Sequence, residues 1–186
     1  GKGEYLLNEK EIRKAYDVIR KGGVILYPTD TIWGLGCDAT NEEAILRIFN
    51  IKKREESKAL ISLVSNKEQL LEITHSIPNI DLTSTPTTII YPSVVKLSPK
   101  LLSNGSAAIR IVKDDFCREL INKLNTPIVS TSANISGEKS PNQFSEISHD
   151  IINNVDYIVN LRKNEIMSTP SNIIRIMNDG STERIR

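Results

Sequence analysis

The sequence alternates short, strongly apolar runs with segments whose apolar residues recur every three or four positions. The first pattern is typical of buried strands, and the second is typical of helices that cover a sheet. Because the two patterns alternate along most of the chain, the sequence predicts an α/β fold with a largely buried sheet. The expected strands are Val24–Tyr27, Ala59–Val64, Thr87–Tyr91, Ala107–Val112, Ile128–Ser130, Tyr157–Asn160 and Asn172–Ile176.

The expected helices carry recognisable start signals. Asn8 and Glu11 have the spacing of a capping box, which predicts a helix over Asn8–Lys21. Thr40 and Glu43 repeat that spacing and predict a second helix after Thr40. The remaining helices are expected over Lys67–Ile73, Asp114–Leu124 and Phe144–Val155.

Composition restricts the class of protein. The chain has 186 residues, and we expect one domain spanning residues 1–186. Its formal net charge is +1, so any contact with nucleic acid would need a local basic patch. Cys37 and Cys117 lie far apart, and with two histidines neither a disulfide framework nor a zinc site is expected. No apolar run has membrane length and no signal peptide is evident, so we expect a cytoplasmic protein without membrane contact.

Rows of small polar side chains recur at the ends of apolar strands. They are Ser84–Thr88, Ser130–Asn134 and Ser168–Ser171, and the loop PTDTIWGLG adds Thr29 and Thr31. A single row would be ordinary turn or cap chemistry. Since α/β proteins bind ligands where strand ends meet loops, several such rows predict a polar cleft for a small ligand.

A basic cluster, IKKREESK, follows the second expected helix. Lys52 and Arg54 are two residues apart, which places them on the same side of an extended segment, and Lys58 follows. Three converging cations would suit a phosphate chain, although a solvated helix end is the alternative. The absence of a histidine beside a candidate serine or cysteine argues against a triad hydrolase, whereas these residue types suit nucleotidyl transfer.

The loop PTDTIWGLG has two further features. Gly34 and Gly36 would let the backbone approach a ligand closely, or else form a tight connection between a strand and a helix. Trp33 is expected to be half-buried, with ligand stacking as the alternative. Asp30 and Asp38 are candidate metal ligands by their position in or next to the loop, but the sequence does not identify a metal site.

The three motifs PTDTIWGLG, KKREESKAL and STSANISG, in this order, resemble the threonylcarbamoyladenylate synthase family with the YrdC-like fold. The resemblance covers almost the whole chain and points to the short, single-domain bacterial form. It implies a twisted mixed sheet flanked by helices, with a concave basic cleft. It also implies that L-threonine, bicarbonate or CO2, and ATP give L-threonylcarbamoyl-AMP and pyrophosphate, with Mg²⁺ accompanying ATP. The expected partners are the proteins that transfer the threonylcarbamoyl group to tRNA, and tRNA itself is a candidate partner.

The resemblance also implies roles for individual residues. Lys52 and Arg54 correspond to catalytic cations. The residues implied in ATP binding are Lys52, Arg54, Lys58, Thr88, Ser132, Asn134, Ser140 and Arg186, with Arg184 as a competitor for the last position. The residues implied in threonine binding are Thr31, Ser130, Ser171 and Arg110.

The chain departs from the family pattern at several positions: Trp33 stands where Tyr is usual, Ala59 where Pro is usual, Leu63 where His is frequent and Thr85 where Gly is usual. In addition, the strand AIRIV around Arg110 lacks the flanking Gly and Pro of the family. Two alternatives of the same fold stay open. A non-catalytic RNA-binding module is disfavoured by the low net charge and the few aromatic residues. A carbamoyl-transfer domain of hydrogenase maturation is disfavoured because such chains are longer and rich in cysteine.

Overall fold

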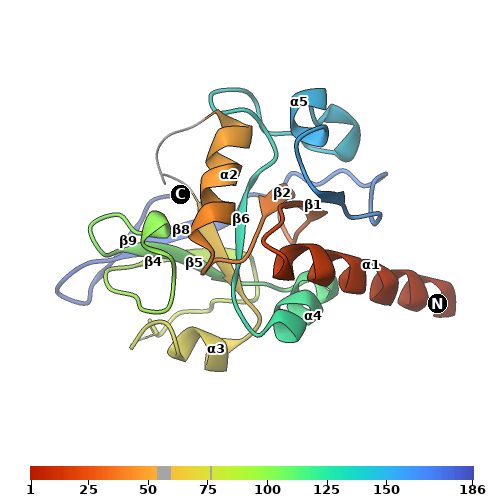
Figure 1. Cartoon of the computed structure of the whole chain (residues 1–186). Coiled ribbons are helices and arrows are strands. Elements are labelled where there is room, and N and C mark those ends of the chain that lie inside the picture. The colour runs from red at the N-terminus through yellow and green to blue at the C-terminus, as the bar shows by residue number, and fades with distance from the viewer. Residues whose placement is uncertain (54–59, 76) are drawn as a thin grey trace.

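The computed structural model describes residues 1–53, 60–75 and 77–186. Its strands form one nine-stranded mixed sheet in the order β7-β1-β2-β6-β3-β5-β4-β8-β9 (Figure 1). The strands are β1 Ile25–Pro28, β2 Trp33–Gly36, β3 Ile61–Val64, β4 Thr87–Tyr91, β5 Ala107–Ile111, β6 Ile128–Ser132, β7 Tyr157–Ile158, β8 Asn172–Ile176 and β9 Thr182–Arg184. The helices are α1 Lys2–Arg20, α2 Glu42–Lys52, α3 Lys67–Leu71, α4 Asp115–Leu124 and α5 His149–Ile152, with 3₁₀ turns η1 Pro99–Leu101 and η2 Phe144–Glu146. The predicted α/β class is confirmed.

Helices cover both faces of the sheet. α1 and α4 lie side by side and pack on one face (Figure 1). Ile19 of α1 and Leu120 of α4 contribute to the apolar core under these helices, together with Leu63 of β3 and Ile128 of β6. The opposite face packs under α2, α3 and α5.

The register of the central strands explains how one face can carry both a core and a site. β3 and β5 are parallel, with Leu63 beside Arg110 and Ile61 beside Ala108. Paired residues point to the same face of a sheet. The face that packs on α1 and α4 at Leu63 therefore continues into a polar surface at Arg110.

Two expected helix starts were wrong. α1 begins at Lys2, so Asn8 lies within the helix, where its side chain donates to Glu119 of α4 at 3.2 Å. α2 is capped by Asn41 rather than Thr40, and the Asn41 side chain accepts from the Ala44 amide at 3.1 Å. Thr40 instead bonds to the carboxylate of Asp38. Neither predicted capping pattern marks the start of its helix, and the first turns of α1, residues 2–7, are exposed.

Two further expectations need correction. The segment 33–36, expected as loop, is strand β2, and it is buried between β1 and β6. The helix expected over Phe144–Val155 is reduced to η2 and α5. β9 had no counterpart among the expected strands, because TER is polar and exposed on both faces. An edge strand of this kind carries no apolar alternation for sequence reasoning to detect.

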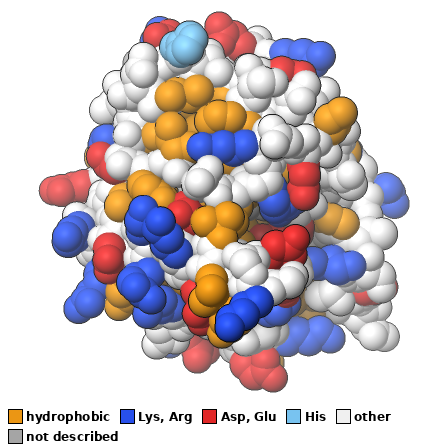
Figure 2. Space-filling model, turned by 90° about the vertical axis from the view of Figure 1, so that its right-hand side faces the viewer, with side chains coloured by type: hydrophobic (Ala, Val, Ile, Leu, Met, Phe, Trp, Pro, Cys, Tyr) orange, Lys and Arg blue, Asp and Glu red, His pale blue; other side chains and the backbone are white. Residues whose placement is uncertain are grey.

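Charges are mixed on the surface where the N-terminus lies. Figure 2 shows Lys and Arg side chains interspersed with Asp and Glu on this side, with apolar side chains between them. This distribution agrees with the net charge of +1. The basic concave face expected from the resemblance stays a prediction. No helix in the part of the chain that the structure describes is long and apolar enough to span a bilayer.

Candidate functional site

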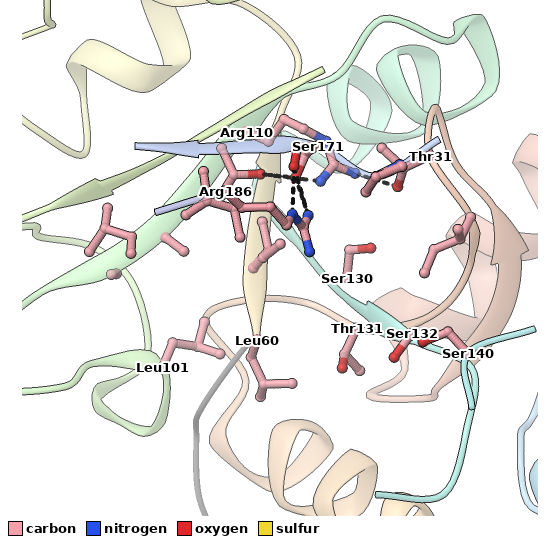
Figure 3. A pocket seen from close by; sticks show the side chains of 18 of the residues that line it. Thr31, Leu60, Leu101, Arg110, Ser130, Thr131, Ser132, Ser140, Ser171 and Arg186 are labelled. Carbon is pink, nitrogen blue, oxygen red and sulfur yellow. Dashed lines mark hydrogen bonds between the residues drawn. The ribbon is translucent and has the colours of Figure 1, made fainter. Parts of the chain in front are cut away.

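A cavity of about 540 Å³ lies over the centre of the sheet (Figure 3). The hydroxyl rows of β4, β6 and the segment before β8 all contribute to its wall, as the sequence predicted for a polar cleft. Eight of the predicted site residues line it: Thr31, Thr88, Arg110, Ser130, Ser132, Ser140, Ser171 and Arg186. Residues up to 155 positions apart in the chain thus meet at one site, since the lining extends from Thr31 to Arg186.

The cavity has an apolar side that sequence reasoning missed. Leu60 and Leu101 lie on one side in Figure 3, whereas Ser132 and Ser140 lie on the other. Further apolar lining comes from Ile61, Ile90, Ala107, Ala108 and Ile173. These positions read as core residues in the sequence, because alternation along a strand does not tell a helix-covered face from an open one. The site can therefore hold a ligand with both an apolar ring and polar substituents.

Arg110 is fixed in the wall of the cavity by three contacts. Its side chain is 2% exposed and forms an ion pair with Asp30, with 3.0 Å between Nη2 and Oδ1. The same nitrogen donates to the Thr31 hydroxyl at 3.4 Å, and Nη1 donates to the Thr88 hydroxyl at 3.4 Å. Both of the latter distances are long for hydrogen bonds, so these donors can turn to a stronger acceptor.

A second arginine reaches the same place from the end of the chain. Arg186 donates to the Ser171 carbonyl from Nε at 2.9 Å and from Nη2 at 2.7 Å (Figure 3). The Ser171 hydroxyl is 2.9 Å from that of Thr88 and accepts from Arg186 at 3.2 Å. Arg184 is turned away and donates to Asn172 at 3.1 Å. The structure therefore favours Arg186 over Arg184 as the cation at the cavity.

Lys52 joins α2 to the motif Ser132–Asn134. This side chain is 2% exposed, and its Nζ donates to the Ser132 carbonyl at 2.5 Å. The Asn134 amide oxygen lies 3.4 Å from Nζ and accepts from the Ser132 hydroxyl. Among the described residues, Lys52 and Asn134 do not line the cavity but stand directly behind Ser132. Arg54 and Lys58, the other two predicted cations, lie outside the described residues.

The PTDT segment is ordered by its own hydroxyls. The Thr29 hydroxyl accepts from the amides of Thr31 and Ile32 at 3.1 and 3.2 Å and donates to the Ile32 carbonyl at 2.7 Å. This turn presents Thr31 to the cavity and Asp30 to Arg110. Thr31 thus owes its position to Thr29, to which sequence reasoning assigned no separate role within the loop.

The two glycines after this turn do not serve close approach to a ligand. A Cβ at Gly36 would lie 2.5 Å from the ring of Tyr27 and 2.7 Å from the Val129 carbonyl. A Cβ at Gly34 would lie 3.1 Å from the Ser130 hydroxyl. Both glycines therefore let β2 fit between its neighbours. Trp33 is wholly buried rather than half-buried and packs on Phe144, with ring centroids 5.1 Å apart.

The two aspartates proposed as metal ligands have other partners. Asp30 is paired with Arg110, and Asp38 accepts from the amide and hydroxyl of Thr40 at 2.8 and 2.7 Å. Among the described residues, no group of three or more His, Cys, Asp or Glu side chains is arranged to hold a metal ion. Asp30 and Asp38 therefore do not fit a protein-held Mg²⁺ site.

Burial is the main cause of the raised pKa values of Asp114 and Cys117, two groups near Arg110. Desolvation raises the pKa of Asp114, and the charge of Asp30 raises it further. Burial likewise raises the pKa of Cys117, whose thiol contacts the Pro28 carbonyl. A buried thiol with a raised pKa is a poor nucleophile, so Cys117 is a core residue rather than a catalytic one.

Comparison with known proteins identifies the family to which this fold belongs. The family model for Sua5, YciO and YrdC proteins, described as telomere recombination, matches residues 17–186.

The chain belongs to this family.

Three relatives illustrate the similarity. Threonylcarbamoyl-AMP synthase of Aliivibrio fischeri is 33% identical over 147 residues, covering 74% of this chain and 80% of the relative. The solved structure of a Sua5 variant from Pyrococcus abyssi matches with a TM-score of 0.83 at 27% identity over 94% of this chain. P. abyssi Sua5 complexed with L-threonine matches with a TM-score of 0.79, also at 27% identity and 94% coverage. The chain spans about half the length of these Sua5 chains, 55% and 53%.

Proposed function

We propose that this chain is an L-threonylcarbamoyladenylate synthase, a nucleotidyltransferase that forms L-threonylcarbamoyl-AMP and pyrophosphate. The observation that carries the proposal is one cavity lined by Arg110 and Arg186 and by the hydroxyls of Thr88, Ser130, Ser132 and Ser171, with Lys52 bound to the Ser132 carbonyl. The relative from A. fischeri is named for this product, and the Sua5 of P. abyssi has been solved with L-threonine. Both support the assignment.

The proposed threonine site is the end of the cavity at Arg110. Its guanidinium would bind the substrate carboxylate, because its contacts to Thr31 and Thr88 are long and easily exchanged. The hydroxyls of Thr31, Ser130 and Ser171 would bind the remaining polar groups of L-threonine. Hydroxyl side chains suit this task since each can donate or accept.

The proposed ATP site is the opposite end, at Ser132 and Ser140. Lys52 would act on the phosphates with Arg54 and Lys58, and Asn134 would hold the Ser132 hydroxyl in place. Thr88 and Arg186 lie near the Arg110 end, where Thr88 contacts Arg110 and Arg186 contacts Ser171, and they would contact the part of the nucleotide that reaches there. The apolar side around Leu60 and Leu101 would accommodate the adenine ring.

The reaction needs positioning and charge neutralisation rather than a protein nucleophile. The threonine amine adds to CO2 and loses a proton, which gives a carbamate. A carbamate oxygen then attacks the α-phosphorus of ATP, and the bond to pyrophosphate breaks. Fixed cations stabilise the charge that develops in this displacement, and each such group typically contributes about 2.7–4 kcal/mol.

The proposal includes the biological setting that the family resemblance implies. The product would pass to proteins that transfer the threonylcarbamoyl group to tRNA, in the cytoplasm. We further propose that residues 1–186 act as one domain, because the sheet takes its strands from Ile25 to Arg184. The RNA-binding alternative gains no support from the mixed charges of Figure 2.

The deciding experiment measures pyrophosphate release from ATP with L-threonine and bicarbonate each present or omitted. Release that requires both substrates, together with mass-spectrometric detection of threonylcarbamoyl-AMP, is the expected result. Folded protein that releases no pyrophosphate with ATP, Mg²⁺, L-threonine and bicarbonate all present would contradict the proposal. Salt-dependent tRNA binding under those conditions would instead favour the RNA-binding module.

A further inference from the structure

We propose that Asp30 is a positioning residue: it holds Arg110 in the orientation in which the guanidinium receives the carboxylate of the amino-acid substrate. The inference rests on the proposed function and deepens it, since it identifies what prepares the threonine end of the cavity. Asp30 was a candidate metal ligand in the sequence, and the structure gives it a different role.

The contact is a buried ion pair at the edge of the cavity. The side chains of Asp30 and Arg110 are 5% and 2% exposed, and their closest atoms are 3.0 Å apart. Arg110 lines the cavity, whereas Asp30 is not among the described lining residues. Asp30 therefore contacts the arginine from behind and leaves its cavity side accessible to a ligand.

Asp30 is also the counter-charge that lets Arg110 stay buried. In the described ranges, it is the only carboxylate in an ion pair with Arg110. Other charged groups in the surroundings are Asp114, whose pKa is raised, Arg162, which is paired with Glu165 at 2.7 Å, and Arg186, which is bound to Ser171. An uncompensated guanidinium would be costly at this depth, so it would swing toward solvent or attract any available anion.

The pairing also leaves suitable donors for a carboxylate. Asp30 engages Nη2 through one oxygen, while Nη1 is 3.4 Å from Thr88. A carboxylate prefers two parallel donors of one guanidinium and forms shorter bonds than a hydroxyl does. Because Asp30 and Arg110 together are neutral, this end of the cavity attracts polyphosphate less than an unpaired arginine would. The pair thus favours a singly charged carboxylate at this end.

The test compares Asp30→Asn with a matched control, Glu11→Gln. Glu11 is also a buried carboxylate, 2% exposed, but it binds Tyr157 and the Asn160 amide far from the cavity. Both changes replace a buried carboxylate with an amide of nearly the same shape. Calorimetric binding of L-threonine and of ATP is measured separately, together with the KM of each substrate and kcat.

Asp30→Asn should weaken L-threonine binding by at least about 30-fold and raise its KM accordingly, since breaking a buried charge pair has effects of this size. The affinity for ATP should change by less than about twofold, and Glu11→Gln should leave both affinities within about twofold of wild type. Asp30→Glu, which retains the charge, should restore most of the threonine affinity. A merely structural role would lower the melting temperature without this selective loss.

Three results would overturn the inference or its basis. Unchanged threonine affinity in folded Asp30→Asn would overturn the positioning role while leaving the synthase proposal standing. Wild-type protein that neither binds L-threonine nor releases pyrophosphate would refute the proposed function itself. If Asp30→Asn does not fold, it is replaced by the double variant Asp30→Asn with Arg110→Gln, which lacks both buried charges. Wild-type affinity of this double variant for L-threonine would overturn the inference.

Discussion

Replacing Lys52 with methionine tests the cluster behind Ser132 most directly. Lys52 is 2% exposed, and its Nζ lies 2.5 Å from the Ser132 carbonyl. Methionine has a similar length and no charge, so it keeps most of the packing while it removes the donor. A hydrogen bond from a charged group contributes about 1.5–3 kcal/mol, and the Ser132 carbonyl would lose this partner. We expect the free energy of unfolding to fall by about 2 kcal/mol, which lowers the melting temperature by about 4–8 °C for a chain of this length.

The same change should reduce turnover more than it reduces stability. If Lys52 neutralises phosphate charge in the transition state, its removal should cost about 2.7–4 kcal/mol of barrier, or about a hundred- to a thousandfold in rate. The rate of pyrophosphate release is measured well below the melting temperature of the variant, so that unfolding does not contribute. The melting temperature is followed by circular dichroism.

Lys53→Met is the matched control for this prediction. Lys53 is the adjacent residue, but its side chain is 66% exposed and forms a surface pair with Asp150 at 3.6 Å. Exposed pairs of this kind contribute little, so the control should stay within about 0.5 kcal/mol of wild-type stability and keep its rate. A Lys52→Met protein that matched the control in both measurements would refute the reasoning.

Two further predictions concern buried groups. Burial raises the pKa of the Cys37 and Cys117 thiols. Neither thiol should therefore react with an aromatic disulfide reagent at about pH 8 in the native protein, whereas both should react in urea. Fast labelling of the native protein would contradict their assignment to the core. Burial also raises the pKa of Asp114, whose carboxylate accepts from the Cys117 amide at 3.1 Å. Because the ionised form is then disfavoured in the folded state, Asp114→Asn should be more stable than wild type near pH 7, and this advantage should shrink as the pH falls toward about 4, where the wild-type group is protonated. Urea unfolding at several pH values measures it, and a difference independent of pH would show that desolvation of the carboxylate is not its cause.

Much of the site could be predicted because its chemistry lies in continuous motifs. The hydroxyl rows at Thr88, Ser130–Ser132 and Ser171 stand at strand ends, and strand ends meet at one edge of the site. The resemblance of three motifs then indicated the family, which the comparison confirms. The functional roles of these residues stay predictions until the variants are measured.

Other parts of the site depend on contacts between distant segments. Nothing in the sequence links Asp30 to Arg110, because they lie 80 positions apart and come together only through the order of the strands. The glycines of the WGLG motif were expected either to let a ligand approach or to form a tight connection, whereas they face Tyr27 and Ser130 on neighbouring strands. A glycine leaves room that a ligand or a neighbouring strand can occupy, and the sequence does not show which of the two occupies it.

The sequence by itself determined the alternation of strands and helices, the apolar faces of those helices and the residue types available for chemistry. These properties follow from local periodicity and from the side chains themselves. Only the tertiary structure decided that Leu63 is covered by helices while its register partner Arg110 opens onto a cavity. Both residues have the same orientation on adjacent strands, and what differs is the position of α4 along the sheet. Where a helix ends relative to the sheet depends on packing across the whole molecule, and no local pattern records it.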